Sequence, residues 1–209
     1  MFKFKSRPLS RFTCHNLQQY SYKKPRQSQL KYSLPLVKNK TTTKIPQYLL
    51  KNISGQLHQL SSFTVETGSP AHIGPHSAAI DFIIPANTNI LAAADGQVIE
   101  VIDKYSIPKI FRCIGNYRFT KLFRPFLNYI AIQHKKNKTT EFTFYAHLKQ
   151  NSAKVNINQK VKAGQIIAQT GWSGWLDRPH LHFIVYTQKP IQFPQETHES
   201  LQPLWQNPS

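Results

Sequence analysis

Acidic residues are scarce in this chain of 209 residues, which has 9 Asp and Glu against 27 Lys and Arg. The first acidic residue is Glu66, and the formal net charge is +18. Such a balance favours a polyanionic neighbour, which could be nucleic acid, an anionic membrane surface or an anionic wall polymer. The charge by itself indicates no particular chemistry.

Cysteine is also rare, with only Cys14 and Cys113 in the whole sequence. No Cys-x-x-Cys spacing occurs, which excludes a cysteine-based zinc site, and we expect two free thiols. Runs of roughly eighteen apolar residues are absent, so we expect no transmembrane helix. The basic N-terminus lacks the apolar stretch and the small-residue cleavage site of a secretory signal.

Composition divides the chain into four parts. Residues 1–45 are basic or neutral and have little to bury, which predicts a basic, poorly ordered N-terminal tail. Residues 46–65 contain spaced leucines and form a lead-in, as either a short helix or an irregular segment. We expect the folded domain over residues 66–190 and a C-terminal extension over residues 191–209.

Beyond residue 63, short runs rich in β-branched and aromatic residues alternate with turn signals. No long helical periodicity appears there, so the domain is predicted to be mainly β, with antiparallel sheets of short strands. The polar turn Lys135–Lys138 joins two of these strands as a hairpin. The expected strands are Ala79–Ile84, Asn89–Ala93, Gln97–Ile102, Tyr129–His134, Glu141–His147, Gln165–Thr170 and His180–Tyr186.

Residues 104–127 interrupt this pattern with six basic residues, no acidic residue and six aromatic residues. A basic segment interleaved with aromatics can stack on bases or lie against sugars. We favour the alternative, in which the aromatics pack inward and the segment flanks the domain. No recognised nucleic-acid motif accompanies the charge, so we expect no specific nucleic-acid partner.

Histidine, in contrast, is frequent: there are nine, and His180 and His182 are separated by one position. Residues i and i+2 of a β-strand project to the same face, so these two imidazoles point into one site while Leu181 faces the core. A His-x-His pair alone does not establish a metal site, because a single strand histidine is usually structural.

Two further residues strengthen the case for a metal. Asp81 interrupts the apolar run Ala79–Ile84, and a buried carboxylate is usually paired or metal-bound because burying it alone is costly. His147 ends a separate predicted strand. Histidines and one aspartate suit a hydrolytic zinc site, which leaves a position for water, lowers the pKa of that water and polarises the scissile carbonyl.

Seven motifs follow one another in a recognisable order between about residues 70 and 187. They are Ala79–Pro85, Ala92–Val98, Asn128–His134, Tyr145–Leu148, Val161–Ala168, Gly171–Gly174 and Pro179–Phe183. This order resembles the lysostaphin-type (LytM-like) peptidoglycan endopeptidases, as a divergent branch. The resemblance implies antiparallel sheets around an open groove, of the duplicated-hybrid-motif type, and a zinc endopeptidase that acts on peptidoglycan.

The resemblance also implies roles for individual residues. Asp81 and His182 match zinc ligands, with one Zn²⁺ expected, and His147 and His180 match the two catalytic histidines. One of these histidines draws a proton from the metal-activated water and the other stabilises the tetrahedral oxyanion, but the sequence does not decide which does which. His134 matches a position that the motif does not require, and we interpret it as structural.

The first zinc-ligand histidine of the family pattern is missing, because Ser77 stands four residues before Asp81. His72, nine residues before Asp81, is the favoured replacement. His76 is the alternative, although strand alternation would turn it away from Asp81. If neither is a ligand, the domain is a degenerate, non-catalytic module that binds wall peptides or regulates another hydrolase.

The resemblance implies a location in the cell envelope, periplasmic or extracellular. There the expected substrate is a peptidoglycan peptide. The basic tail would adhere to an anionic wall polymer or membrane surface.

Overall fold

The computed structural model describes residues 25–36, 56–60, 63–67, 72, 74–112, 121–176, 178–190 and 198–206. In these residues helix is confined to α2 (Lys109–Arg112) and the 3-10 turns η2 (Gly74–His76) and η3 (Lys121–Phe123). The mainly β, antiparallel fold predicted from the sequence is confirmed. The strands are β1 (Gln27–Tyr32), β2 (Gln56–Leu60), β3 (Phe63–Thr67), β4 (Ile80–Ile83), β5 (Asn89–Leu91), β6 (Gly96–Ile102), β7 (Tyr129–Lys136), β8 (Thr139–Ala146), β9 (Lys160–Val161), β10 (Ile166–Gln169), β11 (Leu181–Tyr186) and β12 (Ser200–Trp205).

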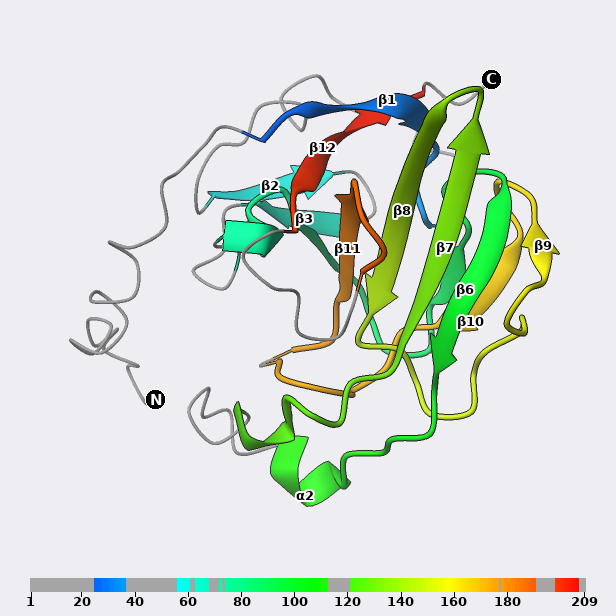
Figure 1. Ribbon diagram of the computed structural model, residues 1–209. Coiled ribbons are helices and arrows are strands. Elements are labelled where there is room, and N and C mark those ends of the chain that lie inside the picture. Colours follow the sequence, from blue (N-terminus) through cyan, green and yellow to red (C-terminus); the bar gives the residue numbers. More distant parts are fainter. Residues whose placement is uncertain are drawn as a thin grey trace.

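One large sheet dominates the molecule (Figure 1). Its strands run in the order β2-β3-β4-β11-β8-β7-β6-β9, and each neighbouring pair is antiparallel. The predicted hairpin is β7–β8, in register from Tyr129 opposite Ala146 to Lys136 opposite Thr139. Strands β5 and β10 form a separate small sheet.

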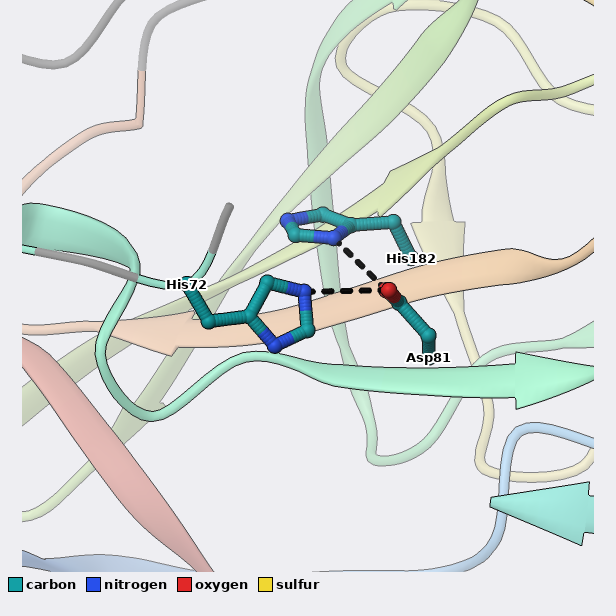
Figure 2. Close-up of side chains that lie close together, drawn as sticks. All are labelled: His72, Asp81 and His182. Carbon is teal, nitrogen blue, oxygen red and sulfur yellow. Dashed lines mark hydrogen bonds and ion pairs between the residues drawn. The ribbon is translucent and has the colours of Figure 1, made fainter. Parts of the chain in front are cut away.

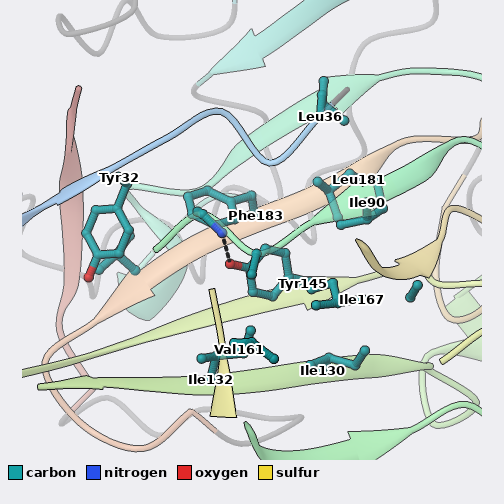
Figure 3. Close-up of a cluster of buried hydrophobic side chains, with 14 of the residues drawn as sticks. Tyr32, Leu36, Ile90, Ile130, Ile132, Tyr145, Val161, Ile167, Leu181 and Phe183 are labelled. Atoms are coloured by element: carbon teal, nitrogen blue, oxygen red, sulfur yellow. Dashed lines mark hydrogen bonds between the residues drawn. The ribbon is translucent and has the colours of Figure 1, made fainter. Parts of the chain in front are cut away.

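The central strands are buried on both faces, and alternation divides their side chains between two apolar clusters. In β7, Ile130 and Ile132 belong to the larger cluster, whereas Tyr129 and Ala131 belong to the smaller one. The larger cluster also contains residues of β5 and β10, so the small sheet packs against the large one (Figure 3).

The same alternation positions the candidate site. In β11, Leu181 and Phe183 point into the larger cluster, and Ile184 belongs to the smaller one. His182 therefore projects on the face of Ile184, away from the main core. His182, which the sequence indicated as a zinc ligand, therefore lies on the face of the sheet that carries the smaller cluster.

One stretch of the predicted tail is ordered, which differs from the expectation for that stretch alone. Residues 27–32 form β1, which lies parallel to β12. Tyr32 is fully buried and its hydroxyl donates to Glu141 Oε2 over 2.8 Å, while the Gln29 amide donates to Glu141 Oε1 over 2.7 Å. The remaining residues of the tail, 1–24 and 37–45, lie outside the described part of the chain.

Two other segments also form strands. Where the lead-in is described, it is neither helical nor irregular: residues 56–60 form β2, which pairs with β3. The C-terminal extension contributes β12, which pairs with β11 as well as β1. Cys14 and Cys113 lie outside the described residues, so the prediction of free thiols stays a prediction.

The segment 104–127 flanks the sheet through α2 and η3. Its described rings pack on one another: Tyr105 lies 5.5 Å from Phe126, and Phe123 lies 5.5 Å from Phe111, between ring centroids. Tyr105, Phe111 and Phe123 are partly buried in this way, whereas Phe126 is 46% exposed. No helix among the residues described above is long and apolar enough to cross a membrane.

Candidate metal centre

Strand pairing brings Asp81 and His182 together. Strands β4 and β11 are antiparallel, with His182 directly opposite Asp81. Asp81 is buried, and His182 Nδ1 lies 2.9 Å from Asp81 Oδ1 (Figure 2). Residues from distant parts of the sequence thus meet because both belong to the same face of adjacent strands.

His72 reaches the same carboxylate from the segment before η2. Its Nε2 lies 3.1 Å from Asp81 Oδ2, and its ring centroid lies 5.1 Å from that of His182. One ligand atom from each of His72, Asp81 and His182 lies within 4.8 Å of the others. Figure 2 shows both imidazoles directed at the carboxylate.

These three residues fit a metal ion. Both ring nitrogens of His72 are buried without a hydrogen-bond partner, because the close approach to Asp81 lacks hydrogen-bond geometry. An unpaired buried polar atom costs free energy, which a bound cation would recover. Two imidazole nitrogens and one carboxylate are a donor set that catalytic zinc uses with a fourth position left open.

His76 and Ser77 make other contacts. His76 Nδ1 lies 3.2 Å from the Tyr186 hydroxyl, and burial together with the neighbouring His182 and His72 lowers the pKa of His76 to about 3. Ser77 Oγ lies 3.3 Å from Ser200 Oγ. Of the two alternatives that the sequence left open, the structure brings His72 into the cluster with Asp81 and His182.

His147 and His180 stand beside this cluster, and each Nδ1 contacts a backbone carbonyl. The Nδ1 of His147 lies 2.7 Å from the Ser173 carbonyl oxygen, and that of His180 lies 2.9 Å from the Arg178 carbonyl oxygen. A carbonyl only accepts, so each Nδ1 carries the proton and each Nε2 keeps its lone pair. The two rings are 4.5 Å apart, and His180 Nε2 lies 3.8 Å from Asp81 Oδ1.

The backbone at His147 leaves the strand abruptly. β8 ends at Ala146, and His147 has a φ of 63°, a left-handed conformation that few residues other than glycine adopt. Its carbonyl accepts the Gly171 amide over 2.8 Å. A side chain at Gly171 would come within 2.4 Å of the Lys149 Cα, so this close approach requires glycine.

The surroundings of the cluster lower the pKa of Asp81 and also the pKa values of His147 and His182. Burial opposes ionisation of Asp81, but His72, His180 and His182 hold its pKa well below the ordinary value. Burial, with a smaller effect of His180 and His182, holds the pKa of His147 well below its ordinary value. Metal ligands must be deprotonated, so these low pKa values suit metal binding.

Asn128 is a residue whose role the sequence did not reveal. It is fully buried, and its amide donates to Ser173 Oγ over 3.0 Å. Its side chain donates to the carbonyls of Tyr105 and Leu148 over 2.8 and 3.1 Å. Asn128 thereby ties the turn that holds His147 to the segment that begins at Tyr105. The sequence offered one signal for this role, since Asn128 is a polar residue at the start of an apolar motif.

Residues 75–194 match Peptidase family M23, which covers more than half of the chain. The chain belongs to this family. The family that the sequence motifs indicated is thus confirmed. The match begins after His72, so this candidate ligand lies outside the matched range.

Several relatives are similar to this M23 chain. An uncharacterized metalloprotease of Buchnera aphidicola subsp. Baizongia pistaciae (strain Bp) is 34% identical over 117 residues, or 56% of this chain and 24% of that protein. A zinc-containing peptidase from Vibrio cholerae is 25% identical, over 75% of this chain and 36% of that one, with a TM-score of 0.41. The catalytic domain of the antimicrobial peptidase lysostaphin from Staphylococcus simulans is 21% identical. The similarity covers 75% of this chain and 94% of that one, with a TM-score of 0.41. This chain spans about a quarter of the Buchnera protein's length.

Proposed function

We propose that this protein is a zinc metalloendopeptidase that hydrolyses peptide bonds in peptidoglycan. The observation that carries the proposal is the joint arrangement of two sets of side chains. His72, Asp81 and His182 converge, with the buried Nδ1 of His72 lacking a hydrogen-bond partner, and His147 and His180 stand beside them. Membership of an M23 family, whose relatives include a metalloprotease and a zinc-containing peptidase, supports the same chemistry.

His72, Asp81 and His182 would hold the zinc ion. When bound, Zn²⁺ supplies a Lewis acid that polarises a carbonyl and makes water a nucleophile at neutral pH. The low pKa of Asp81 keeps its carboxylate available as an anionic ligand, and burial of the cluster strengthens its electrostatic interactions.

His147 and His180 would handle the proton. Because the Ser173 and Arg178 carbonyls hold the protons on Nδ1, each Nε2 is free to accept one from the attacking water. Once protonated, the same Nε2 donates to the developing oxyanion or to the departing amine. Both histidines have this geometry, so the division of roles between them stays open.

A cavity adjoins the segment that holds His147, although none of the five candidate site residues lines it. Its volume is about 320 Å³, and Tyr105, Lys149, Trp172 and Ser173 are among the residues that line it. Ser173 is the residue whose carbonyl holds His147. We also propose a location in the cell envelope, because that is where a peptidoglycan substrate lies.

Metal analysis combined with hydrolysis of purified cell walls tests the proposal. We expect one zinc per chain in the wild type, and loss of both zinc and hydrolysis in Asp81→Ala and His182→Ala. His147→Gln should keep the zinc and lose hydrolysis by about a hundredfold or more, since it removes only a proton carrier.

A matched pair of histidine variants identifies the third ligand. His72→Ala should lose zinc, whereas His76→Ala, a few residues away, should keep it because His76 faces Tyr186. A wild-type protein with neither zinc nor wall hydrolysis would refute the proposal and favour the non-catalytic wall-binding module.

A further inference from the structure

Three large apolar side chains are exposed on the segment 104–127. Ile110 of α2 is 71% exposed, Leu122 of η3 is 66% exposed, and Phe126 is 46% exposed. We call these three residues the apolar tip. An isolated exposed apolar residue needs no explanation, but a group on one protruding segment indicates an interaction surface (Figure 1).

Basic residues accompany the apolar tip. Lys104, Lys109 and Arg124 are exposed, and residues 104–127 contain no acidic residue. Apolar groups that enter a bilayer interface and cations that attract anionic head groups are the two components of peripheral membrane binding.

The segment that carries the apolar tip is fixed by ring contacts within it and by hydrogen bonds to Asn128. Phe123 lies 6.4 Å from Phe126 and 5.5 Å from Phe111, between ring centroids. Asn128 accepts the Tyr105 amide and donates to the Tyr105 carbonyl, over 2.9 and 2.8 Å. Phe111 and Phe123 form the packed part of the segment, while Ile110, Leu122 and one edge of this ring cluster, Phe126, are exposed.

We propose that the apolar tip and its flanking cations dock this protein on an anionic lipid surface. The distribution of side chains favours lipid over nucleic acid. Single-stranded nucleic acid stacks on exposed aromatic rings, but Tyr105, Phe111 and Phe123 are only partly exposed and pack against other rings of the segment. The most exposed side chains, Ile110 and Leu122, are aliphatic.

The apolar tip lies at the end of the molecule that carries His147. The Phe126 carbonyl accepts the Gly174 amide over 2.9 Å, and Ser173 next to it holds the His147 ring. Docking would therefore bring the candidate metal centre close to the lipid surface. The docking itself does not depend on the proposed hydrolysis.

Co-sedimentation of the full chain with vesicles tests the proposal. The protein should bind vesicles of equimolar phosphatidylcholine and phosphatidylglycerol, and bind phosphatidylcholine alone weakly. Ile110→Ser should weaken binding roughly tenfold, since it removes the burial of one aliphatic side chain. Lys109→Glu should weaken it by roughly tenfold as well.

Each variant has a matched control elsewhere on the surface. Ile157 is 55% exposed in a loop outside the segment, so Ile157→Ser removes a comparable apolar side chain. Lys160, exposed on β9, provides the charge control Lys160→Glu. Neither control should change vesicle binding more than about twofold. Thermal unfolding of every variant checks that the fold is retained.

Insertion is measured separately from adhesion. Leu122→Trp should show a blue shift of its difference fluorescence on adding the anionic vesicles, and Ile157→Trp should not. Equal effects within either matched pair, or an unshifted Leu122→Trp spectrum, would overturn the proposal. A different result would overturn it in favour of nucleic acid. In that case the protein would bind a single-stranded oligonucleotide but not vesicles, and this binding would be lost in Lys109→Glu and kept in Ile110→Ser.

Discussion

His134 and His147 are both buried, but their ring nitrogens face different partners. His134 uses both nitrogens structurally, with the Asp95 carbonyl 2.8 Å from Nδ1 and the Thr143 hydroxyl 2.8 Å from Nε2. His147 uses only Nδ1 in this way, with Ser173. The difference separates a histidine that stabilises the fold from one that is available for proton transfer.

Protonation of His134 should make stability depend on pH. Burial lowers the pKa of His134 from 6.5 to about 4, so the unfolded chain binds a proton that the folded chain does not bind between these values. The stability that the neutral His134 contributes is therefore fully present above pH 6.5 and is lost as the pH falls towards 4. We expect a loss of about 3 kcal/mol in the free energy of unfolding over that window.

Urea denaturation at a series of pH values measures this effect. His134→Gln retains hydrogen-bonding capacity without a titrating group, so its stability should fall less steeply than that of the wild type. The same pH slope in both proteins would contradict the assignment.

The residues of the candidate site were predictable to different degrees. Asp81, His147, His180 and His182 lie on or at the ends of strands with clear apolar patterns, and their motifs have fixed spacing. His72 was one of two open alternatives, because η2 interrupts the chain between it and Asp81 and strand alternation gives no guide there. The left-handed backbone at His147 depends on tertiary contacts, so the motif around His147 did not predict this conformation.

At the scale of elements, β1 contacts one buried carboxylate in addition to its pairing with β12. Glu141 of β8 is 2% exposed and accepts from both the Gln29 amide and the Tyr32 hydroxyl. Burial and the nearby Glu141 raise the pKa of Tyr32 above its ordinary value, so the hydroxyl keeps its proton and remains the donor. The contact fastens an otherwise polar strand to the core.

Removing this donor should destabilise the protein. Tyr32→Phe leaves one oxygen of a buried carboxylate without its partner, and we expect a loss of about 1–3 kcal/mol in chemical denaturation. Tyr129→Phe is the matched control, since its hydroxyl donates to Glu100 over 2.7 Å and Glu100 is partly exposed to water. An equal or larger loss in the control would show that burial of Glu141 is not the cause.

Strands were predictable where their apolar pattern was strong. The runs that became β7, β8 and β11 carry bulky side chains on both faces, so pattern alone located them. β1 exposes every second residue, and its buried positions include Ser28, so its polar composition resembled that of a disordered tail. Its order comes from β12 and Glu141, which are remote in sequence.

The whole molecule carries a net charge of +18. We expect it to adhere to anionic wall polymers, because summed surface charge raises the local concentration of a protein near a polyanion. Salt screens such attraction, with a Debye length of about 10 Å at 0.1 M and about 3 Å at 1 M. Adhesion should therefore fall steeply with ionic strength.

Pelleting with purified cell walls at rising sodium chloride concentrations tests this expectation. The protein should be released by salt while its zinc content stays constant, because the candidate ligands are buried and the basic residues are not part of that cluster. Retention that is insensitive to salt would show that contacts other than charge hold the protein on the wall.

The parallel pairing of β1 with β12 bears on how the protein is made. Gln27 lies opposite Gln202 and Tyr32 opposite Trp205, so β1 leaves the ribosome long before its strand partner exists. Chains grow at about 5–20 residues per second, so the backbone of β1 must wait roughly 9–35 seconds before its hydrogen-bonding groups can pair with β12. The nascent chain thus stays open to a chaperone or an export receptor until the last strand is complete.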